Sequence, residues 1–204
     1  MDAHDTPDRA KFVVGLGNPG TKYAGTRHNV GFRVLEIVRD RWRPGAGREA
    51  FDGRLYDARP SRGGESRRVM LLAPQTYMNA SGRAVRRLAD FYKAEPADVL
   101  IVMDDLALPL AALRLRPSGS AGGHNGLADI LRAMGTDQMP RLRIGIGAKP
   151  PGWDQADYVL SRFRPDEREE IDVAIRLAAD AVEDWVFDGM DAAMEKHNRR
   201  RTDD

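Results

Sequence analysis

Apolar and polar residues form two kinds of segment that alternate along the chain from residue 11 onwards. Short runs of β-branched and other apolar residues predict six strands, at 11–16, 53–59, 67–72, 98–103, 112–116 and 141–146. Longer segments with apolar residues every three or four positions lie between several of these runs. This alternation is typical of an α/β layer fold.

Four of the longer segments predict helices. Apolar residues in 29–42 fall mostly on one face, and Ser81 is placed to cap a helix that follows it. A third helix is expected at 125–134. The longest, at 166–187, begins with an acidic turn that suits the helix dipole, and its apolar stripe predicts a purely structural role. The stretches 43–48 and 59–67 are rich in Pro, Gly and Arg, which predicts exposed loops.

Length and composition narrow the class of protein. A chain of 204 residues favours one domain with a proper core, and 32 basic against 31 acidic residues exclude a polybasic protein. The absence of cysteine excludes disulfides, thiolate nucleophiles and iron–sulfur clusters. No apolar run approaches the roughly 18 residues that suggest a membrane span.

The chain ends predict tails and a location. Residues 1–10 and 197–204 are polar, so we expect both to be tails around a domain at 11–196. The N-terminus has three aspartates where a signal peptide would have basic residues, which predicts a cytoplasmic protein without a membrane partner.

Two motifs resemble known sites but lack the right context. Residues 15–20 match G-x-G-x-x-G, yet Pro19 and Gly25 prevent the helix that a dinucleotide site needs directly after the loop. Residues 118–122 resemble a nucleophile elbow without its first glycine, so Ser120 is expected to be a loop residue.

The candidate chemistry lies in polar residues after predicted strands. His4 and His197 are in polar end segments and are expected to be solvated, whereas His28 and His124 each follow a Gly-rich loop and enter a helix. A lone histidine there would cap or fix a loop, but Asp104 follows an apolar strand whose carboxyl end is where ligands bind in α/β sheets. These side chains, with the amides of Asn18, Asn79 and Asn125, could share one crevice.

Such a set allows hydrolysis of an acyl ester. A neutral histidine with a carboxylate behind it can act as a general base, and without a cysteine or a convincing serine the nucleophile is expected to be water. Asparagine amides can hold water, a carbonyl or a peptide amide without adding charge. A metal site of His28, His124 and Asp104 is an alternative, although no local H-x-x-x-H pairing supports it.

Positive charge is concentrated in one region. Residues 111–149 contain six basic and two acidic residues, and arginines near a Gly-rich loop suit a phosphate backbone. A solvated surface is the alternative explanation.

Six ordered blocks resemble bacterial peptidyl-tRNA hydrolases over about 11–196. They are VGLGNPG at 14–20, YAGTRHNVGF at 23–32, PQTYMNASG at 74–82, DDL at 104–106, GSAGGHNGL at 119–127 and RLRIGIG at 141–147. The resemblance implies a monomeric esterase, without metal or cofactor, that cleaves the bond between a peptide and the 3′ ribose of tRNA. We expect a single-domain, three-layer α/β/α sandwich with a central, twisted mixed sheet.

The resemblance also implies residue roles. His28 would be the general base, Asp104 would stabilise its useful state, and Asn18 would read the peptide side of the substrate. The remaining residues expected to bind substrate or tRNA phosphates are Tyr23, Tyr77, Met78, Asn79, His124, Asn125, Arg116 and Arg143. Tyr77 stands where phenylalanine is frequent in the family. A non-catalytic RNA-binding protein on the same fold is the alternative function.

Overall fold

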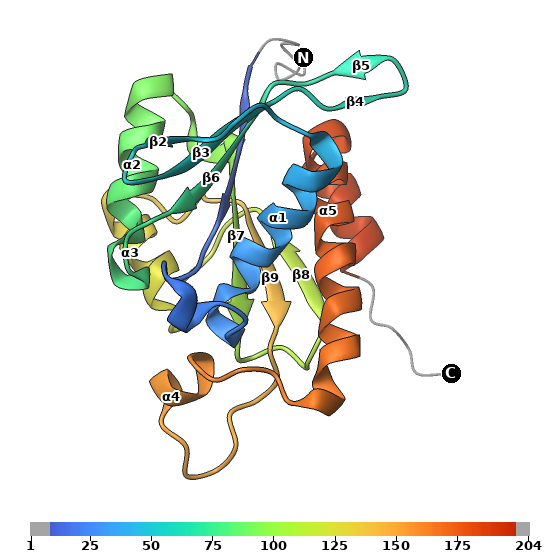
Figure 1. Cartoon of the computed structure of the whole chain (residues 1–204). Coiled ribbons are helices and arrows are strands. Elements are labelled where there is room, and N and C mark those ends of the chain that lie inside the picture. The colour runs from blue at the N-terminus through green and yellow to red at the C-terminus, as the bar shows by residue number, and fades with distance from the viewer. Residues whose placement is uncertain (1–8, 199–204) are drawn as a thin grey trace.

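The computed structural model describes residues 9–198, and Figure 1 shows their arrangement in three layers. His4 and most of both expected tails lie outside these residues. The central sheet has the strand order β2-β3-β6-β1-β7-β9-β8. Its parallel strands are β1 (Lys11–Gly15), β6 (Val69–Pro74), β7 (Val99–Asp105) and β9 (Arg141–Gly145). The antiparallel strands are β2 (Arg48–Ala50), β3 (Gly53–Ala58) and β8 (Leu113–Arg116).

Helices cover both faces of this sheet. α1 (Val30–Trp42) and α5 (Pro165–His197) lie on one face, and α2 (Ser81–Tyr92) and α3 (Asn125–Met134) lie on the other (Figure 1). The short α4 (Gln155–Val159) lies beyond the carboxyl ends of the strands (Figure 1). The expected three-layer α/β/α sandwich with a mixed sheet is therefore confirmed.

The sheet divides the core into two parts because successive residues of a strand point to opposite faces. On β1, Val13 packs in the cluster that contains Val34 and Trp185, from α1 and α5. Its neighbour Val14 packs in the cluster that contains Leu88 and Ile130, from α2 and α3. All of these side chains are nearly inaccessible, and each contributes roughly 1.5–3 kcal/mol by burial.

The predicted loops contain short strands. β2 begins at Arg48, at the end of the stretch 43–48, and β4 (Ser61–Arg62) and β5 (Glu65–Ser66) form a hairpin within 59–67. Their residues are mostly exposed on both sides, so they lack the apolar alternation by which a strand is recognised.

Two details of the helix predictions were wrong. Ala80, not Ser81, is the N-cap of α2, because the 3-10 turn η3 (Met78–Ala80) leads directly into the helix. The Ser81 hydroxyl instead donates to the carbonyl of Met78, 2.9 Å away. α5 extends ten residues past the predicted end at 187, with a break at Gly189, where φ is 84°.

The break in α5 places its last turns against the body of the molecule. His197 was predicted to be solvated, but only 8% of its side chain is exposed and its Nε2 lies 2.7 Å from Asp184 Oδ2. The side chain of Asn198 accepts from the Leu115 N–H at 2.7 Å and donates to the Leu115 carbonyl at 3.1 Å. Asn198 thus occupies the hydrogen-bonding groups of Leu115 on the outer strand β8.

Candidate active site

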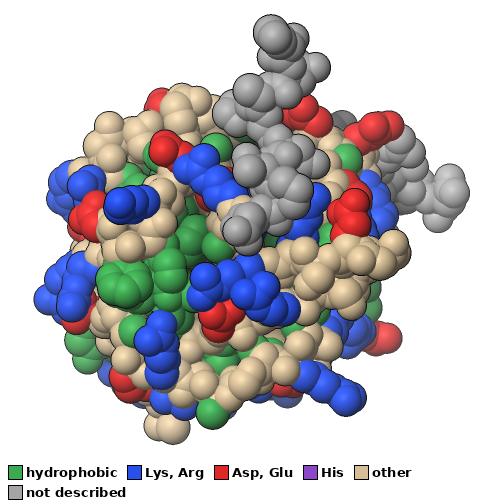
Figure 2. All heavy atoms as spheres, turned by 90° about the horizontal axis from the view of Figure 1, so that it is seen from above, with side chains coloured by type: hydrophobic (Ala, Val, Ile, Leu, Met, Phe, Trp, Pro, Cys, Tyr) green, Lys and Arg blue, Asp and Glu red, His purple; other side chains and the backbone are tan. Residues whose placement is uncertain are grey.

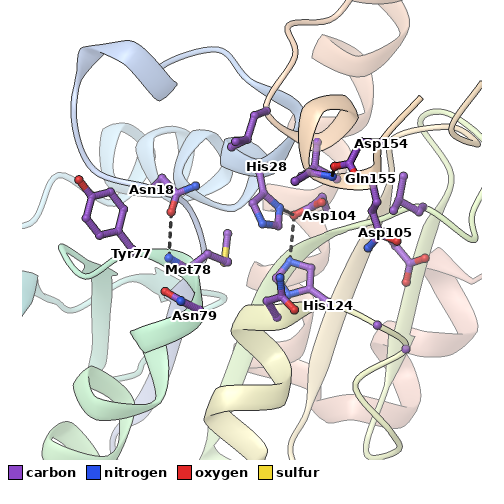
Figure 3. Close-up of a pocket in the computed structure, with 17 residues that line it drawn as sticks. Asn18, His28, Tyr77, Met78, Asn79, Asp104, Asp105, His124, Asp154 and Gln155 are labelled. Atoms are coloured by element: carbon purple, nitrogen blue, oxygen red, sulfur yellow. Dashed lines mark hydrogen bonds and ion pairs between the residues drawn. The ribbon is translucent and has the colours of Figure 1, made fainter. Parts of the chain in front are cut away.

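A cavity of about 440 Å³ opens at the carboxyl ends of the central strands. Asn18 follows β1, Tyr77 to Asn79 follow β6, and Asp104 is the last residue but one of β7. Figure 3 shows the side chains of Asn18, His28, Met78, Asp104 and His124 around this space. The structure therefore brings together the polar groups that strand-end position predicts.

Close packing at Gly31 positions the start of α1. A Cβ atom there would lie 2.4 Å from the carbonyl oxygen of Val102 and 2.5 Å from the backbone nitrogen of Leu16. Only glycine allows α1 to approach β1 and β7 this closely. The 3-10 turn η2 (Arg27–Asn29), which precedes α1, is thereby placed beside β7.

One carboxylate oxygen joins the two histidines of the site. Asp104 Oδ1 lies 2.8 Å from His28 Nδ1 and 3.0 Å from His124 Nε2, and all three side chains are buried. The Leu127 N–H donates to His124 Nδ1 at 3.2 Å, so that nitrogen has a lone pair and Nε2 bears the proton. His124 is therefore a neutral donor to Asp104, a role that the sequence did not predict.

The same geometry determines the tautomer of His28. Its Nδ1 donates to the ionised Asp104, which leaves Nε2 with a lone pair. Burial by itself raises the pKa of Asp104, but the imidazoles of His124 and His28 have a larger opposite effect and lower it below the ordinary value. The carboxylate thus stays ionised and accepts from both rings.

Asn18 is fixed by an amide that sequence reasoning missed. Asn29 accepts from the Asn18 N–H and donates to the Asn18 carbonyl, both at 2.9 Å. The Asn18 Oδ1 then accepts from the Met78 N–H at 2.8 Å. The Nδ2 group of Asn18 is consequently the part of its amide that remains to donate to another molecule.

Of the other predicted site residues, some line the cavity and some lie beside it. Asn79 and Asn125 are exposed and line the cavity with Tyr77 and Met78. Tyr23 is not among the lining residues; its ring packs edge-on against Tyr77, with 6.4 Å between ring centroids. The Tyr77 hydroxyl points away from the cavity in Figure 3, and 62% of the residue is exposed.

The far wall of the cavity comes from α4 and the residues after it, for which the sequence predicted no element. Asp154 caps α4 by accepting from the Ala156 N–H at 2.7 Å. Arg27 ties this segment to η2, since its Nε donates to the Ser161 hydroxyl at 3.3 Å. Its Nη1 donates to the Ile146 carbonyl at 3.0 Å and its Nη2 to Glu167 Oε2 at 2.6 Å. The guanidinium also stacks on Tyr158, 4.5 Å from the ring centroid. Because Glu167 belongs to α5, that helix also supports the site.

Four arginines cluster on the pair β8 and β9. In the antiparallel register Arg114 lies opposite Arg143 and Arg116 opposite Arg141, so all four belong to one face. Arg141 is buried and donates to four backbone carbonyls, including Gly119 at 2.7 Å, which fixes the loop before His124.

The two arginines predicted to bind phosphates lie outside the cavity lining. Arg116 is exposed, and Arg143 is partly exposed with its Nε bonded to Asp105. Burial lowers the pKa of Arg141, and the positive charge of the neighbouring Arg143 lowers it further. At the end of the molecule remote from α4, Lys and Arg side chains are interspersed with Asp and Glu (Figure 2).

Three of these side chains could also hold a metal ion. One donor atom each from His28, Asp104 and His124 lies within 4.8 Å of the others. In the arrangement described above, however, the two ring nitrogens nearest Asp104 donate hydrogen bonds to it. A metal ion would have to replace both protons.

An Asp–His pair in a cavity at the ends of parallel strands is the kind of site that α/β hydrolases use. The cavity holds an Asp–His pair, and none of its lining residues in 9–198 is a serine, threonine, cysteine or lysine that could attack a substrate. No helix in the described part of the chain is both long and apolar enough for a membrane span.

Comparison with known proteins identifies the family. The family model described as peptidyl-tRNA hydrolase matches residues 12–204. The peptidyl-tRNA hydrolase of Rhodopirellula baltica is 48% identical over 92% of this chain and 97% of its own length. That of Symbiobacterium thermophilum is 46% identical over 93% and 99%. The crystal structure of the Acinetobacter baumannii enzyme covers 97% of each chain, with a TM-score of 0.83 and 36% identity.

The chain belongs to the peptidyl-tRNA hydrolase family. Its reaction is hydrolysis of peptidyl-tRNA, which releases the peptide from the tRNA. The alternative of a non-catalytic RNA-binding protein is not favoured.

Proposed function

We propose that His28 is the general base of this reaction. The observation that supports this role is the 2.8 Å contact between His28 Nδ1 and Asp104, which leaves the lone pair on Nε2. Nε2 takes a proton from water as the water oxygen forms a bond to the ester carbonyl carbon. The bond from that carbon to the ribose 3′ oxygen then breaks, and the leaving oxygen receives the proton from His28. The products are the free peptide acid and tRNA with a 3′ hydroxyl.

Neutral amides recognise the peptide in this proposal. Asn18 directs its Nδ2 group towards a peptide carbonyl, because its Oδ1 is already bonded to the Met78 N–H. Asn79 and Asn125 hold water or the ester carbonyl, and Tyr77 and Met78 form the wall. A site that reads main-chain amides accepts any peptide sequence but discriminates against an unblocked α-ammonium, which lacks an acyl carbonyl.

The tRNA binds on the side of β8 and β9. Arg116 is the exposed member of the arginine cluster, and Arg143 lies beside Asp105 at the cavity. Crowded positive charges, of which Arg143 is paired with Asp105, favour a polyanion such as the acceptor stem. We further infer a metal-independent monomer in the cytoplasm, with the domain at 11–196.

The test is release of tRNA from two substrates that differ in one group. N-acetylated aminoacyl-tRNA should be cleaved rapidly in excess EDTA, and the unblocked aminoacyl-tRNA should not. Loss of cleavage in EDTA would support the metal alternative, and equal cleavage of both substrates would contradict amide reading.

The variant His28→Ala tests the general base in the same assay. We expect turnover to fall by about 10²- to 10⁴-fold, with tRNA binding changed less than about twofold. A comparable loss of binding would contradict the assignment.

A further inference from the structure

A second cavity lies at the same edge of the sheet as the active site. It has a volume of about 370 Å³ and is lined by Phe51, Asp52, Gln75, Thr76, Arg83 and Arg87, with Glu49, Ala50 and Gly53. Gly53 pairs with Pro74 at the carboxyl end of β6, and the Gln75 N–H donates to the Asp52 carbonyl at 2.8 Å. The segment after β6 therefore separates the two cavities, with Thr76 lining one and Tyr77 lining the other.

Thr76 has an unused hydroxyl beside this second cavity. The residue is only 7% exposed, and its Oγ1 has no hydrogen-bond partner among the described residues. A buried hydroxyl without a partner is unfavourable, and a ligand that bonds it would remove this cost. Rotation about χ1 exchanges the positions of hydroxyl and methyl, so the hydroxyl can turn towards a group that enters the cavity.

The opposite wall is a strained turn held by specific contacts. Phe51 and Asp52 connect β2 to β3 with φ of 53° and 52°, values at which glycine or asparagine is usual. Arg87 and Arg83 bind Asp52 Oδ2 at 2.8 and 3.2 Å, and the Phe51 ring packs on Phe91. Such strain persists where the surroundings enforce it, commonly at ligand sites.

The order of the strands places this cavity and the arginine cluster on opposite sides of the active site. The arginine cluster is at the β8 end of the sheet, His28 and Asp104 are near its centre, and the second cavity is at β6, β3 and β2. A substrate with tRNA on β8 and its ester at His28 extends its peptide in the opposite direction. Its path leads past Tyr77 towards Thr76.

We propose that the second cavity is a subsite for the main chain of the nascent peptide. This inference rests on the proposed function. Thr76 is two residues from Met78, at most about 8 Å along the chain, and an extended peptide advances about 3.3–3.6 Å per residue. The subsite therefore receives peptide residues about two to four positions before the ester.

The charges of the cavity suit a main chain rather than one kind of side chain. Two arginines and two carboxylates line it, and Asp52 is bonded to both arginines. The Thr76 hydroxyl can both donate to a carbonyl and accept from an N–H. Peptides with acidic and with basic residues at these positions should consequently be cleaved with kcat/KM values within about threefold.

The test compares two substrates that share the same C-terminal residue and tRNA. One has a single N-acetylated residue and the other an N-acetylated hexapeptide, and the variant is Thr76→Val. We expect kcat/KM for the hexapeptide to fall about three- to tenfold, as one hydrogen bond is lost, and that for the short substrate to stay within twofold. An equal effect on both substrates, or none on either, overturns the subsite.

Further outcomes separate this proposal from its alternatives. Failure of the unaltered protein to cleave either substrate would contradict the proposed function instead. Arg87→Gln should leave the affinity for free tRNA unchanged. The control is Arg86→Gln, at a neighbouring residue on α2 that pairs with Asp90. If only Arg87→Gln weakens tRNA binding, the cavity is a phosphate site and the peptide subsite is wrong. A changed melting temperature of Thr76→Val without a change in length preference would show a structural role only.

Discussion

The proton positions in the active site follow from a single backbone N–H. Leu127 donates to one nitrogen of His124, so the other nitrogen donates to Asp104, and this carboxylate in turn orients His28. The three side chains come from segments far apart in the sequence, 76 and 20 residues from Asp104 to its two partners. A capping contact at the start of α3 thereby contributes to the state of the proposed base.

Replacement of Asp104 should show how this carboxylate stabilises the fold. Asp104→Asn replaces the buried charged acceptor of two hydrogen bonds by a neutral amide oxygen, and we expect the free energy of unfolding to decrease by about 1–3 kcal/mol at pH 7. Because the pKa of Asp104 is lowered on folding, its stabilisation is complete above the unfolded value of about 3.9 and is lost as pH falls below it.

Urea denaturation between pH 3 and 8 measures this effect. The difference between the unaltered protein and Asp104→Asn should be constant from pH 5 to 8 and decrease below about pH 4. A difference that decreases from pH 8 towards pH 5 would contradict the expected sign. Asp90→Asn, at an exposed carboxylate on α2, provides a control.

At the scale of elements, the pair β8 and β9 places like charges side by side. Arg116 is exposed opposite the buried Arg141, and Arg143 lies two residues further along the same face of β9. Their mutual repulsion is unfavourable in the free protein and would be relieved by the tRNA phosphates that we propose bind here.

Arg116→Ala should weaken tRNA binding in a way that depends on salt. Loss of one phosphate contact lowers the slope of log K against log salt concentration by about one unit. Arg39→Ala, which removes an exposed arginine that pairs with Asp40 on α1, should leave the slope unchanged. Equal slopes for Arg116→Ala and the unaltered protein would exclude Arg116 from the phosphate contacts.

The elements that sequence reasoning predicted are those with a strong apolar pattern. The strands that became β1 and β7 are buried runs, and 125–134 matches α3 to the residue. β2 and the β4–β5 hairpin could not be predicted because their residues are polar and depend on neighbours for pairing. Similarly, the grouping of His28, Asp104 and Asn18 could be predicted because such residues lie near the ends of predicted strands. The roles of Asn29 and Arg27 could not, because they depend on partners up to 140 residues away in the sequence.

At the scale of the whole molecule, Arg27 joins segments from both halves of the chain. Its guanidinium contacts the end of β9, the segment after α4 and the first turn of α5, and the next residue is His28. It is only 3% exposed, so its charge depends on Glu167 for compensation.

Removal of Arg27 should destabilise the protein more than removal of the ion pair as a whole. Arg27→Met removes the buried partner of Glu167 and leaves that carboxylate with Arg164 alone, and we expect a loss of about 3–5 kcal/mol. Adding Glu167→Gln, which can still accept from the Arg164 N–H, should restore part of that loss. Urea denaturation of both variants measures the difference, and a double variant with fully additive losses would contradict the explanation.

The contact between Asn198 and Leu115 has a consequence for association between molecules. β8 is the last strand of the sheet, and an unpaired N–H and carbonyl on such a strand can pair with a strand from another chain. The Asn198 amide satisfies both groups of Leu115, and the break at Gly189 directs it there. The Asn198 side chain, just after α5, thus opposes edge-to-edge aggregation. A chain truncated before Asn198 would expose the N–H and carbonyl of Leu115 to a strand from another molecule.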